Sequence, residues 1–188
     1  MLNAFYISLT KYNLLRPPSY IGLDNYRSFP HDEYFLNAMR ATLTFVAGSV
    51  IPLLFVSLFC AFLLQRWKYL SNTISMVLYS PMVISVVVAS IVWRLLLHPL
   101  GLVNTFTQSL WGRTYLWLSD RTYAQLAMII VMIWRNLGYY TILWLSGLKS
   151  IPASFYEAAE IDGVSEAQRL RYISLPLLKP TMAFILAI

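Results

Sequence analysis

The chain has 188 residues, of which 59% are hydrophobic and 12% are charged, and its mean hydropathy is +0.61. Soluble domains carry about 25% charged residues, so this composition excludes an ordinary soluble protein and indicates a membrane protein. The net charge of +6 does not indicate nucleic-acid binding, because the 14 lysines and arginines are scattered and form no basic stripe. We interpret them as markers of membrane edges. The single cysteine, Cys60, excludes a disulfide within the chain and predicts a packed, inert thiol.

The first 40 residues contain no complete membrane span. Residues 1–12 are shorter than the roughly 20 apolar residues that cross a bilayer, and we interpret them as the end of a first transmembrane helix. Residues 12–29 contain Pro17-Pro18, Gly22 and scattered charge, which indicates an irregular surface segment. Residues 1–40 therefore form a first region, made of the end of a helix and a segment outside the membrane.

Three long apolar runs follow, and each predicts a transmembrane helix. Residues 41–65 include no charged residue, residues 70–93 form a second uncharged run, and residues 122–148 carry one charge at their centre. Arg66 and Lys68 form a basic turn between the first two runs. Between the second and third runs, a short interfacial helix is expected at residues 102–110.

A polar segment interrupts the apolar sequence after the third run. Ser154 followed three residues later by Glu157 matches a capping box, which predicts a helix that begins at Phe155. Gly163 can adopt the left-handed conformation that ends a helix, so this helix should have only two turns.

A second helix is predicted directly after the first. Ser165 and Gln168 repeat the capping-box spacing. Pro176 and Pro180 then mark where the segment bends or passes into the next apolar run, which begins at residue 181. The expected product is a helix–turn–helix at the end of a membrane bundle.

This segment resembles the "EAA" signature of permeases from ABC importers. The match consists of Glu157-Ala158-Ala159, Gly163 after three residues, Ile173 after nine more, and Leu175-Pro176 after one more. Ile151-Pro152 before the signature and residues 177–180 after it resemble the carbohydrate branch of that family. Residues 22–26 resemble a phrase found in the first of the two permeases of sugar importers.

The resemblance implies an all-α integral membrane protein with a MetI-like permease bundle. Residues 41–188 would be the permease domain, shortened relative to the family, with its cytoplasmic coupling loop at residues 151–176. In the family, that loop docks in a cleft on the ATPase subunit. The residues implied in coupling are Glu157, Ala158, Ala159, Asp162, Gly163, Ile173, Leu175 and Pro176.

The resemblance also implies partners and a location. The chain would pair with a second permease subunit in a bacterial or archaeal cell membrane, above two ATPase subunits that bind ATP and Mg²⁺ and below an extracytoplasmic solute-binding protein. If the loop at 151–176 is cytoplasmic, the turn at Arg66 is cytoplasmic too, and residues 13–40 and 99–121 lie outside. The positive-inside rule agrees at that basic turn.

Arg135 lies at the centre of the third run, with thirteen uncharged residues on each side. A charge at mid-membrane costs about 2.5–3.5 kcal/mol on insertion scales, so it should face a cavity, a partner or the bundle interior. Its hydrogen-bonding and aromatic neighbours suit sugar hydroxyls and sugar faces, and the resemblance places this helix on the substrate path. Two interpretations stay open: a wet path lined by these residues, or a structural pairing of Arg135 with a neighbouring helix. The candidate path residues are Arg135, Asn136, Gly138, Tyr139, Tyr140 and Thr141.

The sequence contains no pattern that indicates an enzyme. None of the seven glycines fits a phosphate-binding P-loop, and no metal-ligand spacing, nucleophile elbow or dinucleotide fingerprint is present. We therefore expect no cofactor in this chain and no catalysis by it. A sugar importer is the leading hypothesis. The alternatives are an ABC permease for polyamine, phosphate or peptide, and a secondary transporter or membrane scaffold that does not use ATP.

Overall fold

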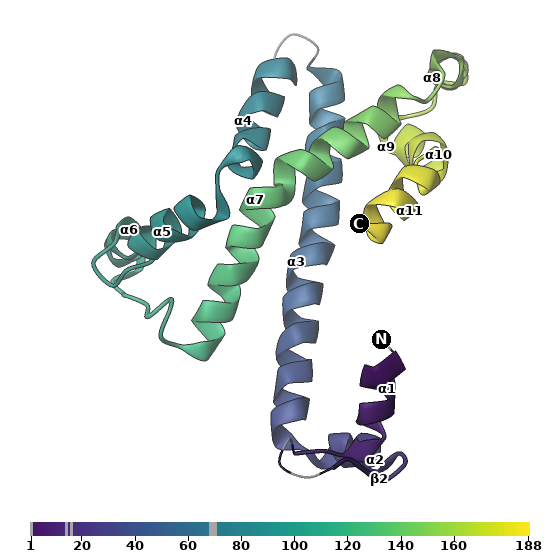
Figure 1. Cartoon of the computed structure of the whole chain (residues 1–188). Coiled ribbons are helices and arrows are strands. Elements are labelled where there is room, and N and C mark those ends of the chain that lie inside the picture. Colours follow the sequence, from purple (N-terminus) through teal and green to yellow (C-terminus); the bar gives the residue numbers. More distant parts are fainter. Residues whose placement is uncertain (1, 14, 16, 68–70) are drawn as a thin grey trace. The chain divides into compact units, whose positions relative to one another are not determined.

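The computed structural model describes residues 2–13, 15, 17–67 and 71–188, and most of these residues are helical (Figure 1). The chain divides into two compact units, Met1–Phe45 and Val46–Ile188. Helix α3 (Glu33–Arg66) passes from the first unit into the second.

The N-terminal unit is more regular than the sequence indicates. Its elements are α1 (Leu2–Ser8), β1 (Thr10–Lys11), β2 (Ser19–Tyr20), α2 (Asp24–Ser28) and the 3₁₀ turn η1 (Phe29–His31). The expectation of an irregular segment at residues 12–29 was thus wrong in part, because β2 pairs antiparallel with β1 and α2 is a helical turn. Asn25 explains this order: its side-chain amide donates to the carbonyl oxygens of Ser8 (2.8 Å) and Thr10 (3.0 Å). Such bonds tie α2 to the end of α1.

The first predicted span is confirmed and is longer than expected. Helix α3 includes the whole of residues 41–65, and it begins where the carboxylate of Asp32 accepts the backbone N–H groups of Tyr34 (2.8 Å) and Phe35 (3.2 Å). Pro52 lies inside the helix, which continues on both sides of it. The predicted basic turn after α3 includes Lys68, which lies outside the described residues.

The second apolar run forms two helices where one was expected. Helices α4 (Ser71–Val83) and α5 (Val86–Leu96) meet at 96°, so the helix predicted for the run at residues 70–93 is broken in two, although the bent pair could still form one span (Figure 1). Pro81 lies in the last turn of α4 and lacks the N–H that a helix needs. Ser85 then has an extended backbone and begins α5. We call this turn, at Ile84 and Ser85, the α4–α5 break.

The short helix and the third span are confirmed. Helix α6 (Leu102–Trp111) ends at Gly112, whose φ of 66° is left-handed, and α7 (Arg121–Lys149) covers the predicted third run. The carboxylate of Asp120 starts α7 by accepting N–H groups from Thr122 (2.9 Å) and Tyr123 (3.1 Å).

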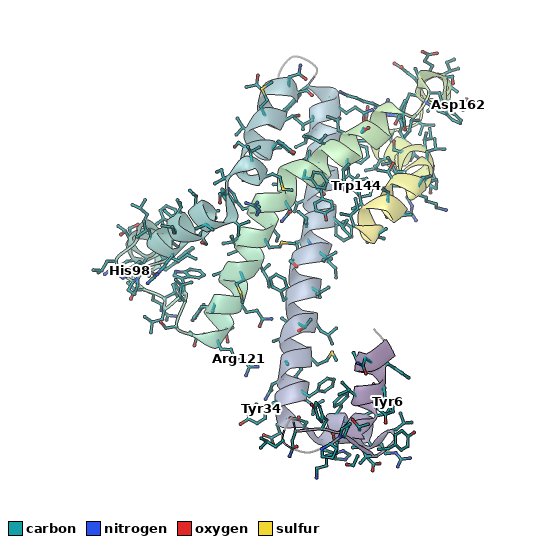
Figure 2. All side chains as sticks on the ribbon, viewed as in Figure 1. Tyr6, Tyr34, His98, Arg121, Trp144 and Asp162 are labelled. Carbon is teal, nitrogen blue, oxygen red and sulfur yellow. The ribbon has the colours of Figure 1, made fainter. Side chains whose placement is uncertain are left out.

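Among the described residues, α3 and α7 are each long and apolar enough to cross a membrane. Up to four spans result if each of two bent helix pairs, α4 with α5 and residues 170–177 with residues 179–187, counts as one. The second unit has its buried core where α3, α7 and the C-terminal helix meet. There the indole N–H of Trp144 (labelled in Figure 2) donates to the hydroxyl of Ser57 at 3.1 Å, and Leu148 and Leu178 are almost fully buried.

Candidate functional site

The polar segment forms a hairpin between α7 and the C-terminal helix, and we call residues 151–176 the polar hairpin. Its tip includes Asp162, labelled in Figure 2. The elements are α8 (Ala153–Ile161), α9 (Glu166–Arg169), the π-helix η2 (Leu170–Ser174) and α10 (Leu175–Leu177), followed by α11 (Lys179–Ala187). The predicted helix–turn–helix is therefore present.

The first helix of the polar hairpin begins differently from the prediction. Helix α8 starts at Ala153, two residues before Phe155, and its N-cap is Pro152, with no side-chain hydrogen bond at the cap. The capping box between Ser154 and Glu157 was thus a wrong prediction. Proline suits the start of a helix because its φ is fixed and it has no N–H to leave unpaired. Glu157 is exposed and is not used as a cap.

The turn at the tip is confirmed in detail. Gly163 has a φ of 67°, its N–H donates to the carbonyl of Glu160 (3.2 Å), and the N–H of Val164 donates to that of Ala159 (3.0 Å). These two bonds form a Schellman motif, which ends a helix with a left-handed residue. The polar hairpin therefore has a defined tip.

The second capping box is also confirmed. The side-chain oxygen Oε1 of Gln168 accepts the backbone N–H of Ser165 at 2.9 Å, and the N–H of Gln168 donates to Oγ of Ser165 at 3.4 Å. The expected bend lies at Leu178, where the helical segments on either side meet at 52°, and Pro180 lies in the first turn of α11.

A contact that sequence reasoning missed joins the two arms of the polar hairpin. The hydroxyls of Tyr156 and Ser174 form a hydrogen bond of 3.2 Å, and the guanidinium of Arg169 lies 5.4 Å from the centre of the Tyr156 ring. Arg169 also pairs with Glu166 at 2.6 Å. Ser174 is the last residue of the π-helix η2, which places it in this contact. No local pattern in the sequence predicts a π-helix.

The structure brings four of the predicted coupling residues together. Ala158, Ala159, Asp162 and Ile173 line one shallow hollow of about 430 Å³. Ala159 is 4% exposed, whereas Ala158 and Asp162 are exposed. A larger side chain at either alanine would fill the hollow.

The other predicted coupling residues lie elsewhere. Leu175 and Pro176 line a separate apolar groove of about 440 Å³ with residues of α3, α7 and α11. Glu157 lies on the exposed surface of α8, with Glu160 also exposed. The signature thus combines residues of the tip with residues that seat the polar hairpin on the helices below it.

The candidate path residues on α7 are largely in contact with neighbouring backbone. Gly138 is buried against α4, where an added Cβ would clash with the carbonyl of Leu78. Thr141 is 1% exposed and donates to the carbonyl of Leu137, and Asn136 donates to that of Met132. Tyr139 and Tyr140 are half-buried, with their rings edge to face.

Arg135 also bonds to backbone. Its guanidinium donates to the carbonyl oxygens of Ile84 (2.8 Å), in the α4–α5 break, and Pro81 (3.4 Å), in the last turn of α4. These hydrogen bonds support the pairing of Arg135 with a neighbouring helix, whereas a substrate path along these residues stays a prediction.

Comparison with known proteins gives close sequence relatives. The chain is 32% identical over 184 residues to the probable ABC transporter permease protein YesP of Bacillus subtilis, covering 96% of the chain and 59% of that protein. It is 35% identical over 184 residues to the probable ABC transporter permease protein PH1215 of Pyrococcus horikoshii, covering 95% of the chain and 63% of that protein. The chain thus spans about three fifths of the length of these relatives.

Solved structures show the same fold. A bacterial ABC transporter that imports the acidic polysaccharide alginate matches with a TM-score of 0.82 at 24% identity, covering 98% of this chain and 63% of that one. The family described as "Binding-protein-dependent transport system inner membrane component" matches residues 53–188, which is more than half of the sequence. The chain therefore belongs to this family of inner-membrane transport components and has its MetI-like permease fold.

Proposed function

We propose that the chain is part of a permease subunit of an ATP-driven importer, and that its polar hairpin transmits movement of the ATPase subunits to the membrane helices. The observation that carries this proposal is the hollow formed by Ala158, Ala159, Asp162 and Ile173 at the hairpin. Ala158, Ala159 and Ile173 belong to the matched signature, Asp162 directly precedes its glycine, and the family match includes all four residues.

Under this proposal, the polar hairpin moves as a rigid unit. The Schellman motif at Gly163 and the capping box at Ser165 fix its turns, and the bond from Tyr156 to Ser174 joins its arms. The buried residues Ile151 and Leu178 connect it to the core shared by α3, α7 and α11. A push on the hairpin is therefore passed to three membrane helices together.

Charge suits a partner with a basic surface. Glu157, Glu160 and Asp162 are all exposed on or beside α8. Opposite charges across an interface direct association and fix its orientation. Under this proposal, ATP and Mg²⁺ bind to the partner ATPase subunits, and this chain hydrolyses nothing itself. Its other partners are a second permease subunit and an extracytoplasmic solute-binding protein.

We propose a sugar or sugar derivative as the cargo. One relative, 30% identical over 173 residues, is the arabinooligosaccharides transport system permease protein AraP of Bacillus subtilis. Another, 32% identical over 170 residues, is the sn-glycerol-3-phosphate transport system permease protein UgpA of Yersinia enterocolitica. The second relative makes a phosphorylated polyol the alternative cargo. The family match argues against a transporter that works without ATP.

Two glycines in left-handed conformation offer a matched test of the proposal. Gly163 (φ 67°) lies in the polar hairpin and Gly112 (φ 66°) ends α6, and an added Cβ has open space at both. Valine at either position costs about 1–2 kcal/mol in backbone strain. We expect Gly163→Val in the full-length protein to release the ATPase or to uncouple ATP hydrolysis from transport, and Gly112→Val to leave coupling intact.

The measurements are co-purification of the ATPase and transport-linked hydrolysis in proteoliposomes. Wild-type coupling in Gly163→Val, with the protein normally inserted, would contradict the proposed role of the polar hairpin.

A further inference from the structure

The α4–α5 break leaves backbone groups without helical partners in a bent helix pair that is apolar enough to form one membrane span. The last carbonyl groups of α4 have no N–H partner within that helix, since α4 ends at Val83 and the chain turns by 96°. Unsatisfied backbone groups are costly in an apolar environment, so a break at membrane depth must be satisfied by protein or water.

Arg135 supplies the missing donors. Its Nη1 lies 2.8 Å from the carbonyl oxygen of Ile84 and 3.4 Å from that of Pro81. A helix C-terminus carries partial negative charge, which favours a cation at this point. An arginine in an apolar span needs partners as much as the carbonyls need donors, so the bond satisfies both.

Two neighbours of Arg135 hold the break from either side. Trp134 meets Trp93 of α5 edge to face, with ring centres 5.4 Å apart. Gly138 allows the backbone of α4 to approach α7 so closely that a Cβ would clash with Leu78. Positions 134, 135 and 138 lie on adjacent turns of α7, so one side of this helix contacts both α4 and α5.

We infer that Arg135 is a positioning residue: it caps α4 from α7 and thereby holds the α4–α5 break at its angle. The tryptophan pair and Gly138 hold the two helices close enough for the guanidinium to reach its acceptors. The role of Arg135 is therefore to fix the direction of α5 relative to α4, through backbone that has no other partner within the helix.

The test is a distance measurement across the break. Met76 on α4 and Val92 on α5 are exposed at 73% and 46%, so each accepts a spin label as cysteine in a Cys60→Ala background. The protein is the full-length permease in its assembled transporter, reconstituted in lipid. We expect Arg135→Gln to widen the distance distribution between the labels at least twofold, and Arg135→Lys, which keeps a charged donor, to restore most of its sharpness.

Arg94→Gln is the matched control, because Arg94 is an exposed arginine in the last turn of α5, and it should leave the distribution unchanged. If Arg135→Gln does not assemble, the test rests on Arg135→Lys alone. The proposal then requires that the distribution of distances between the labels be measurably broader in Arg135→Lys than in the wild type. A wild-type distribution in the assembled variant would overturn the proposal. If that variant combined a wild-type distance distribution with a changed KM for cargo, Arg135 would be assigned to the substrate path. The distances are read without ATP, so failure of the proposed coupling function would not affect the result.

Discussion

The polar hairpin and helix α7 differ in how far apart along the chain their bonded residues lie. In the hairpin, the bonded residues Ser165 and Gln168 are three positions apart, and Tyr156 and Ser174 are 18 apart. On α7, Arg135 reaches acceptors 51 and 54 positions away, and Trp144 reaches Ser57 across 87. The hairpin is thus specified mainly by local signals, and the membrane helices by contacts between distant segments.

This difference predicts where substitutions act. A change in the α7 packing should disturb several helices together and cost the most. A change in the polar hairpin should remain local and alter coupling more than it alters overall stability.

The largest effect is expected at Gly138. Its Cβ would clash with the backbone of α4 at Leu78, and backbone cannot rotate away as a side chain can. We expect Gly138→Ala to destabilise the assembled protein by about 1–3 kcal/mol, in the range of overpacked sites. The measurement is thermal inactivation in detergent.

Gly48→Ala is the matched control for this change. Its Cβ would meet Cδ1 of Ile129 at 2.7 Å, which is the flexible end of a side chain. The midpoint temperature should therefore change much less than in Gly138→Ala. Equal shifts in the two variants would show that backbone contact between α4 and α7 is not what limits this packing.

A smaller, local effect is expected at Tyr156. Tyr156→Phe removes the hydroxyl that bonds to Ser174, and a typical hydrogen bond contributes about 0.5–1.5 kcal/mol. Backbone amides of the polar hairpin should exchange hydrogen several-fold faster, while those of α3 and α7 should keep their wild-type rates. Tyr172→Phe is the control, because Tyr172 is 67% exposed on the same hairpin. Faster exchange throughout the membrane helices would contradict a local role.

The same contrast explains what could be predicted from the sequence. The left-handed turn at Gly163 and the cap at Ser165 were predicted because each depends on residues three to five positions apart. The cap at Ser154 failed although its spacing fits, since Pro152 two residues earlier starts the helix. Spacing alone does not decide between two competing helix starts.

Non-local features could not be predicted in this way. An uncharged run that contains Pro81 fits a straight, kinked or broken helix equally well, and the 96° turn depends on the bonds from Arg135. Arg135 itself stood out as a charge in an apolar run, but its partners lie on another helix. The sequence does not indicate the contact between Tyr156 and Ser174, because this contact requires both the turn at the tip and the π-helix η2 that follows it.

In the proposed transporter, the tip of the polar hairpin faces the ATPase, while its base is seated on the membrane helices. Ala158 is exposed and lines the hollow, and Pro176 lines the apolar groove with α3 and α7. The most direct test places single cysteines at these positions in the full-length, Cys60→Ala protein and treats the assembled transporter with a short cross-linker. We expect a cross-link to the ATPase from Ala158→Cys and none from Pro176→Cys. A cross-link from position 176, with none from position 158, would contradict this expectation.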